Sequence, residues 1–147
     1  METPLALLVS SLTDEHTSVL ELFANVRDAG LGTAASNALL ACAGKALQAS
    51  IHREETDLFP ALHRVGVPES LRSRVRHSME SLGQLKVQAA EFLGRWSAGG
   101  EGLDFARDFG GLVGALQFRM RMDETYLYAP FKQLLTGKSP RPLASGA

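Results

Sequence analysis

The chain has 147 residues, of which 45% are hydrophobic and 21% charged, with 15 basic and 16 acidic side chains and one cysteine, Cys42. A chain of this size can bury about 70% of its unfolded surface, so we expect one globular domain that needs no disulfide framework or structural metal to fold. A single thiol excludes an intramolecular disulfide and a cysteine-based zinc site. The net charge of −1 argues against nucleic acid as a partner.

The N-terminal residues predict neither a secretory signal nor a membrane anchor. The chain starts Met1-Glu2-Thr3-Pro4 and reaches a short apolar run, residues 5–9, with no preceding basic region. Polar residues interrupt every apolar run before it approaches the roughly 18 residues of a membrane-spanning helix. We therefore expect a cytoplasmic protein with no membrane partner.

Glycine and proline divide the chain into four long segments. The breaks fall at residues 30–32, 66–68 and 99–102, and a last one near 137–142. The segments between them predict helices over residues 5–29, 33–64, 68–97 and 103–135. Short connections between four long amphipathic helices favour an all-α fold, an up-down-up-down four-helix bundle over residues 1–136. Residues 137–147 predict a flexible C-terminal tail.

The first two segments each show one apolar face. His16 is followed by Val19, Leu20 and Phe23 at i+3, i+4 and i+7, so its side chain is predicted to face the core. The second segment has apolar residues at helical spacing, namely Leu39, Ala43, Leu47, Ile51, Leu58 and Leu62.

The third segment has the clearest stripe, and the fourth is rich in glycine. In the third, Ser78 is the one polar residue on an apolar stripe, and His77 lies about 100° from the axis of that stripe, on its flank or in solvent. In the fourth, Gly110, Gly111 and Gly114 each cost about 1 kcal/mol relative to alanine. These glycines allow close helix contact or fray that end of the helix.

Two acidic segments precede prolines on different helices. Residues 55–60 read Glu-Thr-Asp-Leu-Phe-Pro, and residues 124–130 read Glu-Thr-Tyr-Leu-Tyr-Ala-Pro. A proline late in a long helix bends or ends it. His16 and His77 lie on the other two predicted helices.

At these residues the chain resembles the hemerythrin-like, or HHE cation-binding, family, a four-helix bundle with a non-haem di-iron site. That family has one histidine on each of helices 1 and 3, and a His-x-x-x-Glu before a proline on each of helices 2 and 4. The resemblance implies metal ligands at His16, Glu54, His77 and Glu124. It also implies iron as the cofactor, as a pair, or as one iron or a zinc if the ligand set is reduced.

The chain departs from the family pattern at two positions. Ser50 stands where the family has its helix-2 histidine, and Met120 where it has its helix-4 histidine. Neither side chain replaces an imidazole well as an iron ligand. His52 offers a partial substitute, because it pairs with Glu55 at i,i+3 on one helical face. The two Glu-Thr repeats align Glu55 with Glu124, whereas core spacing favours Glu54, so both registers remain open.

Tyr128 lies one turn after Glu124, and its position allows three roles. It donates a hydrogen bond to a carboxylate, binds a cofactor as a phenolate, or packs in the core. Arg119 or Arg121 beside Glu124 supplies ordinary ion pairing as the alternative to a metal site.

Three function classes follow from these residues. The first is a non-haem iron protein with a reduced His/Glu site that reacts with or senses O₂, peroxide or NO. The second is a metal-free bundle whose core cavity uses a His/Glu acid-base pair to bind or convert a small organic molecule. The third is an interaction platform. The sequence alone does not indicate whether the protein is an enzyme, or its oligomeric state.

Overall fold

The structure, a computed structural model, describes residues 3–135, and all the regular structure in this range is helical. The predicted tail, residues 137–147, lies outside the described residues. The helical elements are α1 (Pro4–Asp28), α2 (Ala34–Arg53), the π turn η1 (Glu54–Leu58), α3 (Phe59–Val65), α4 (Glu69–Arg95), α5 (Gly102–Asp123), the π turn η2 (Glu124–Tyr128) and α6 (Ala129–Leu135). The prediction of an all-helical fold is confirmed.

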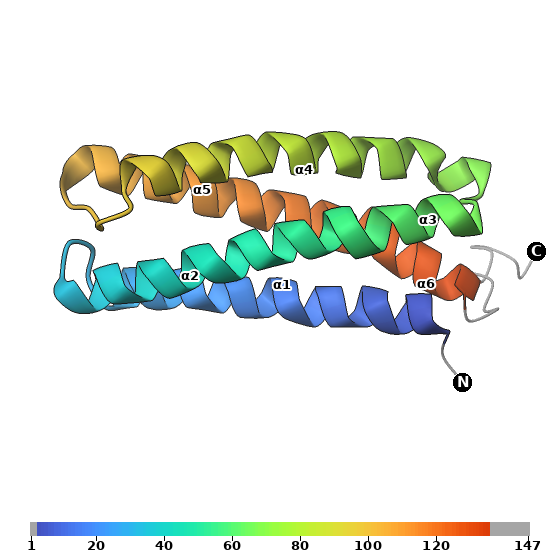
Figure 1. The fold of residues 1–147 in the computed structure, drawn as a ribbon, viewed down its shortest axis with the longest axis horizontal. Coiled ribbons are helices and arrows are strands. Elements are labelled where there is room, and N and C mark those ends of the chain that lie inside the picture. The colour runs from blue at the N-terminus through green and yellow to red at the C-terminus, as the bar shows by residue number, and fades with distance from the viewer. Residues whose placement is uncertain (1–2, 136–147) are drawn as a thin grey trace, which may run out of the picture.

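These elements form four long rods that lie side by side (Figure 1). One rod is α1, the second runs without a break through α2, η1 and α3, the third is α4, and the fourth runs through α5, η2 and α6. Successive rods run in alternating directions, as Figure 1 shows. The rods coincide within a few residues with the four predicted segments, because each segment carries its own apolar stripe and its own stop signals.

Threonine side chains cap the start of α1 and α2, and two glycines form the turn between these helices. The Thr3 Oγ1 accepts a hydrogen bond from the Ala6 N–H at 3.1 Å, and the Thr33 Oγ1 does the same for Ser36. Between these helices, Gly30 and Gly32 have φ of 87° and 91°. This left-handed backbone strains side chains other than glycine, so the two residues permit the tight reversal between α1 and α2.

The bundle core is apolar at one end and polar in its middle. Near the α1–α2 and α4–α5 connections, Phe23, Phe92, Phe105 and Phe109 pack together with ring centroids about 6 Å apart. Farther along the bundle, buried polar side chains replace this aromatic packing: His16, Ser50, Glu54, Ser78, Arg119 and Asp123. We call this part of the core the polar level, and its buried polar side chains are the candidates for a functional site.

Two further observations concern the surface. The exposed glycines of α5, Gly110, Gly111 and Gly114, lie inside the helix, and a Cβ added at any of them would meet nothing within 4 Å. The expected close helix contact at these glycines is thus absent, and so is the expected fraying.

Within residues 3–135 no helix combines the length and the apolar character needed to cross a membrane.

Candidate functional site

Two π turns position the two carboxylates of the site. In each, a backbone N–H donates to the carbonyl five residues earlier: Phe59 to Glu54, and Ala129 to Glu124. The extra residue in each turn comes just before Pro60 or Pro130, where an α-helix would need an N–H that proline lacks. Such π turns are frequent at functional sites. Glu54 and Glu124 are the first residues of the two turns and hold equivalent positions in their rods.

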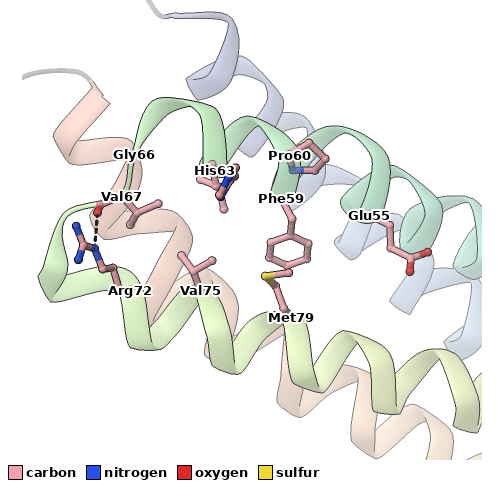
Figure 2. A pocket seen from close by; sticks show the side chains of 10 residues that line it. Glu55, Phe59, Pro60, His63, Gly66, Val67, Arg72, Val75 and Met79 are labelled. Carbon is pink, nitrogen blue, oxygen red and sulfur yellow. Dashed lines mark hydrogen bonds between the residues drawn. The ribbon is translucent and has the colours of Figure 1, made fainter.

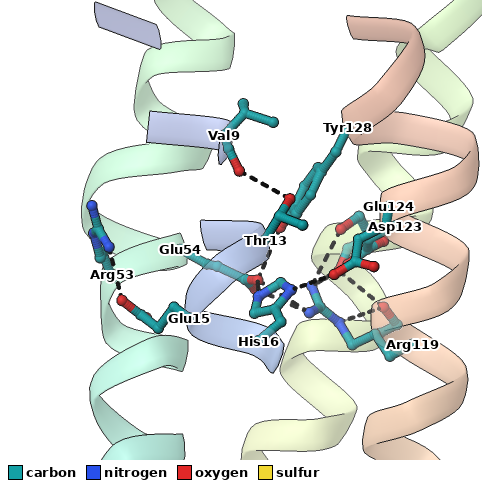
Figure 3. A network of polar contacts seen from close by, with 12 residues as sticks. Val9, Thr13, Glu15, His16, Arg53, Glu54, Arg119, Asp123, Glu124 and Tyr128 are labelled. Atoms are coloured by element: carbon teal, nitrogen blue, oxygen red, sulfur yellow. Dashed lines mark hydrogen bonds and ion pairs between the residues drawn. The ribbon is translucent and has the colours of Figure 1, made fainter. Parts of the chain in front are cut away.

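Glu54 lies at the centre of the polar level, with a side chain that is 1% exposed. Its Oε1 accepts hydrogen bonds from His16 Nε2 at 2.8 Å and from the Tyr128 hydroxyl at 3.0 Å. Its Oε2 lies 3.0 Å from Arg119 Nη1. Figure 3 shows these donors converging from α1, α5 and η2. Burial raises the pKa of the Glu54 carboxyl, but His16, Arg119 and Tyr128 outweigh it, so the pKa is lowered and the group is a carboxylate at neutral pH.

His16 lies between the two carboxylates. Its Nε2 faces Glu54, and its Nδ1 lies 3.7 Å from Glu124 Oε1 on the other side of the ring. Burial lowers the pKa of His16, but the nearby carboxylates of Glu124 and Glu54 outweigh burial and raise the pKa to about 9. The ring is therefore an imidazolium at neutral pH, with Nδ1 buried and without a hydrogen-bond partner among the described residues.

Arg119 closes the site on the side of α4. Its Nη2 lies 3.1 Å from Asp123 Oδ2 and donates to the Ser78 carbonyl at 3.1 Å, and its Nε donates to Ser81 Oγ at 3.0 Å. Burial raises the pKa of the Asp123 carboxyl more than Arg119 lowers it. We call the linked set the His16 network, which comprises His16, Glu54, Ser78, Ser81, Arg119, Asp123, Glu124 and Tyr128.

The structure brings some of the sequence-predicted site residues together and leaves others outside. His16, Glu54, Glu124 and Tyr128 all belong to the His16 network. The other three candidates, His52, Glu55 and His77, are exposed. Glu55 pairs with Lys86 at 3.1 Å, so Glu54 and not Glu55 is the inward carboxylate of its rod.

Ser50 and Met120, which stand where the family pattern has histidines, are both buried. They add no nitrogen ligand to the polar level, and His16 is the one buried histidine among the described residues. His77 is exposed and lines the pocket between α4 and α5 that includes Arg119 and Asp123.

The donor set does not fit a di-iron centre. Arg119 holds a permanent positive charge 3.0 Å from Glu54 Oε2, in the space that a metal on this carboxylate would use. Glu54 and Glu124 face different nitrogens of His16, so a metal bound at either nitrogen is directed away from one of the carboxylates. Among residues 3–135, no group of three or more histidine, cysteine or acidic side chains is arranged to hold a metal ion.

Besides Ser81, three polar residues of the His16 network are absent from the predicted site residues, namely Ser78, Arg119 and Asp123. Arg119 was considered only as a partner of Glu124, whereas it pairs with Glu54 and Asp123. The signal that points to them is positional: Arg119 and Asp123 interrupt the apolar stripe of α5, and Ser78 interrupts that of α4. Polar residues on a stripe that is otherwise buried need partners, so they tend to meet one another.

Two surface pockets reach the His16 network. One, of about 270 Å³, lies between α1 and the η2–α6 end and is lined in part by Ser10, Thr13, Glu124 and Tyr128. We call it the α1–α6 pocket. The other, of about 180 Å³, lies between α4 and α5 and includes Arg119 and Asp123. The Glu124 side chain is 35% exposed, so it connects the buried imidazolium with solvent.

Comparison of the chain with family models, with curated proteins and with solved structures finds no match.

Proposed function

We propose that the protein binds a small carbonyl compound in the α1–α6 pocket and exchanges protons with it, with His16 and Glu124 as the acid-base pair. The observation that carries the proposal is the state of His16 Nδ1. Among the described residues this atom is buried without a hydrogen-bond partner, and it lies 3.7 Å from the partly exposed Glu124 carboxylate, which lines a pocket. Buried polar atoms of this kind are rare in proteins and call for an explanation, such as a ligand.

The two sides of the imidazolium support different roles. Glu54 is held by three donors and cannot easily accept another proton, so it orients and stabilises the imidazolium. The Nδ1–H is then a donor for a carbonyl oxygen once the exposed Glu124 side chain moves aside. Glu124 is placed to take a proton from the carbon next to that carbonyl and to return it.

The α1–α6 pocket suits a small polar molecule. Its volume of about 270 Å³ lies below the ~300–1,000 Å³ that is common for pockets of drug-sized ligands. The Ser10 hydroxyl, which belongs to its lining, is buried and has no hydrogen-bond partner within residues 3–135. A ligand that carries a hydroxyl or carbonyl oxygen supplies a partner for this Ser10 hydroxyl.

We also propose, from the motif resemblance alone, that the bundle is a divergent relative of the hemerythrin-like family in which Arg119 supplies the charge that a metal would supply. Iron or zinc binding, with O₂, peroxide or NO chemistry, is the competing function. The position of Arg119 on Glu54 argues against it.

The test is a titration with hydroxyacetone, followed by the NMR signals of the His16 ring and by deuterium uptake into the probe in D₂O. We expect saturable shifts of the His16 signals and faster uptake than in buffer, both lost in Glu124→Gln. The control Glu21→Gln changes an exposed carboxylate on α1 outside the pocket and keeps both effects.

Two results would overturn the proposal. One is an unchanged His16 spectrum at high probe concentration. The other is stoichiometric iron or zinc, found by elemental analysis after anaerobic loading of the purified protein, since a metal at this level would occupy the carboxylates that the proposal needs.

A further inference from the structure

A third pocket lies between α3 and α4, at the end of the bundle, and shares no lining residue with the His16 network (Figure 2). Its volume is about 680 Å³, which falls within the ~300–1,000 Å³ common for small-molecule sites. We call it the α3–α4 groove. It opens just after the η1 turn, where α3 begins.

The walls of the α3–α4 groove are apolar. Phe59 of α3 faces Val75 and Met79 of α4 across the groove (Figure 2). Met79 is 51% exposed, so a large part of its flexible side chain has no apolar neighbour. Apolar surface on facing walls of a groove favours an apolar occupant between them.

The charges at the two ends of the groove differ. Arg72 lies at the end beside the Gly66–Val67 connection, and His63 lies on the α3 wall, as Figure 2 shows. Among residues 3–135, Arg72 is engaged only through its Nε, which donates to the Val67 carbonyl at 3.4 Å. Glu55 at the opposite end is neutralised by Lys86, whose Nζ donates to both carboxylate oxygens at 3.1 Å. Within the part of the chain that the structure describes, one end therefore offers a guanidinium edge without a partner, and the carboxylate at the other end is paired.

We propose that the α3–α4 groove binds a linear amphipathic carboxylate, with its carboxylate on Arg72 and its alkyl chain over Val75, Met79 and Phe59. A guanidinium pairs with a carboxylate through two parallel hydrogen bonds. Arg72 and Met79 are seven residues apart on one helix face, about 10 Å along the axis, so the groove accommodates a chain of medium length.

The experiment is a calorimetric titration of the full chain with octanoate. Shorter and longer members of the series extend it, and we expect each added methylene to tighten binding about fourfold until the chain outgrows the groove. Octyltrimethylammonium, which has the same chain and the opposite charge, binds much more weakly than octanoate if Arg72 holds the head group.

Two pairs of variants test the two ends of the ligand separately. Arg72→Gln weakens octanoate binding by about tenfold or more, because a hydrogen bond to a charged group is lost, and Arg76→Gln on the same helix leaves it unchanged. Met79→Glu places a negative charge in the path of the chain and abolishes binding, whereas Val87→Glu, at a residue 57% exposed and outside the groove, does not.

All four substituted side chains are exposed, and circular dichroism verifies that each variant is folded. Equal binding of octanoate and octyltrimethylammonium, or an unchanged affinity in Arg72→Gln, would show that the groove does not recognise a carboxylate. Absence of octanoate binding together with a dimer that Met79→Glu dissociates, measured by sedimentation, would assign the groove to a second copy of this chain and overturn the proposal.

Discussion

At the scale of single residues, the Glu54 carboxylate determines how the polar level is built. A buried carboxylate without partners is very costly, and Glu54 avoids that cost with two cationic donors and one phenol. Arg119 in turn divides its guanidinium between Glu54, Asp123 and the α4 serines. Because each of these side chains pairs with another, the removal of one leaves a buried charge without a partner in apolar surroundings.

The first prediction concerns Arg119→Met. This change leaves Asp123 without its cation and Glu54 with His16 and Tyr128 alone, and we expect the free energy of unfolding to fall by about 3 to 5 kcal/mol. Urea denaturation followed by circular dichroism measures it. Arg95→Met is the control, because Arg95 pairs with Asp108 on the surface and such pairs contribute about 0 to 1 kcal/mol. Equal losses in the two variants would contradict a buried role for Arg119.

The second prediction concerns the pH dependence of stability. The pKa of His16 is raised from 6.5 to about 9 by Glu124 and Glu54, against burial and Arg119. A raised pKa in the folded state means that the stabilisation is complete below pH 6.5 and is lost as the pH rises through 9. The loss at the upper end amounts to about 3 kcal/mol.

Urea unfolding between pH 5.5 and pH 9.5 measures this loss of stability at high pH, and NMR of the ring carbons gives the pKa of His16 directly. His52→Gln, which changes an exposed histidine, keeps the same pH profile. A His16 ring that titrates near its ordinary pKa would show that Glu54 and Glu124 do not hold it as an imidazolium.

At the scale of elements, the sequence predicted the rods well and the site only in part. The stripes of Leu, Val, Ala and Phe repeat every three or four residues, and this local signal is enough for the four helices. The π turns were visible only as two prolines after acidic residues, because proline signals a disturbed helix and does not specify the bonding that replaces it.

The site was harder to predict because its partners lie on different helices. His16 and Glu54 stand among apolar neighbours, so their inward position was readable from spacing. Arg119 and Asp123 also lie on an apolar stripe, but arginine and aspartate are usually exposed, and their pairing with Glu54 and each other depends on rods brought together only by the fold. The family pattern suggested His77 as a ligand, and its helical position already placed it off the buried stripe, where the structure leaves it exposed.

The third prediction belongs to helix α5. Gly110→Ala is expected to stabilise the protein by about 0.5 to 1 kcal/mol, because the residue is exposed inside a helix and an added methyl meets nothing. Gly44→Ala in α2 is the contrast, since its Cβ would lie 2.8 Å from Leu93 Cδ2. Thermal unfolding of both variants measures the difference, and a destabilising Gly110→Ala would show that this face of α5 contacts something.

At the scale of the whole molecule, the His16 network joins two helical hairpins. His16 and Glu54 belong to the α1–α2 hairpin with its η1 extension, and Arg119, Glu124 and Tyr128 belong to the α4–α5 hairpin with its η2 extension. The Arg119–Glu54 and His16–Glu124 ion pairs and the tyrosine hydrogen bond run between the hairpins, at one level of an otherwise apolar core (Figure 3). A polar level in a bundle core sets the register of its helices at some cost in stability.

The last prediction separates stability from chemistry by replacing the network as a unit. The combined variant His16→Leu, Glu54→Met, Arg119→Met, Asp123→Leu and Tyr128→Phe removes the buried charges of the network and the Tyr128 hydroxyl. It keeps Ser78, Ser81 and the partly exposed Glu124. Buried ion networks replaced by apolar side chains of similar volume are often neutral or stabilising, so we expect a free energy of unfolding at least equal to that of the natural chain.

The same variant is expected to lose the response to hydroxyacetone, since the imidazolium and its orienting carboxylate are gone. Urea denaturation at neutral pH measures the first effect and NMR titration the second. If the combined variant were less stable than Arg119→Met alone, the network would be chiefly a structural tie between the hairpins. If it is as stable as the natural chain, stability does not explain why five buried polar side chains stand in the core, and loss of the hydroxyacetone response in the same variant then supports the proposed proton exchange at His16.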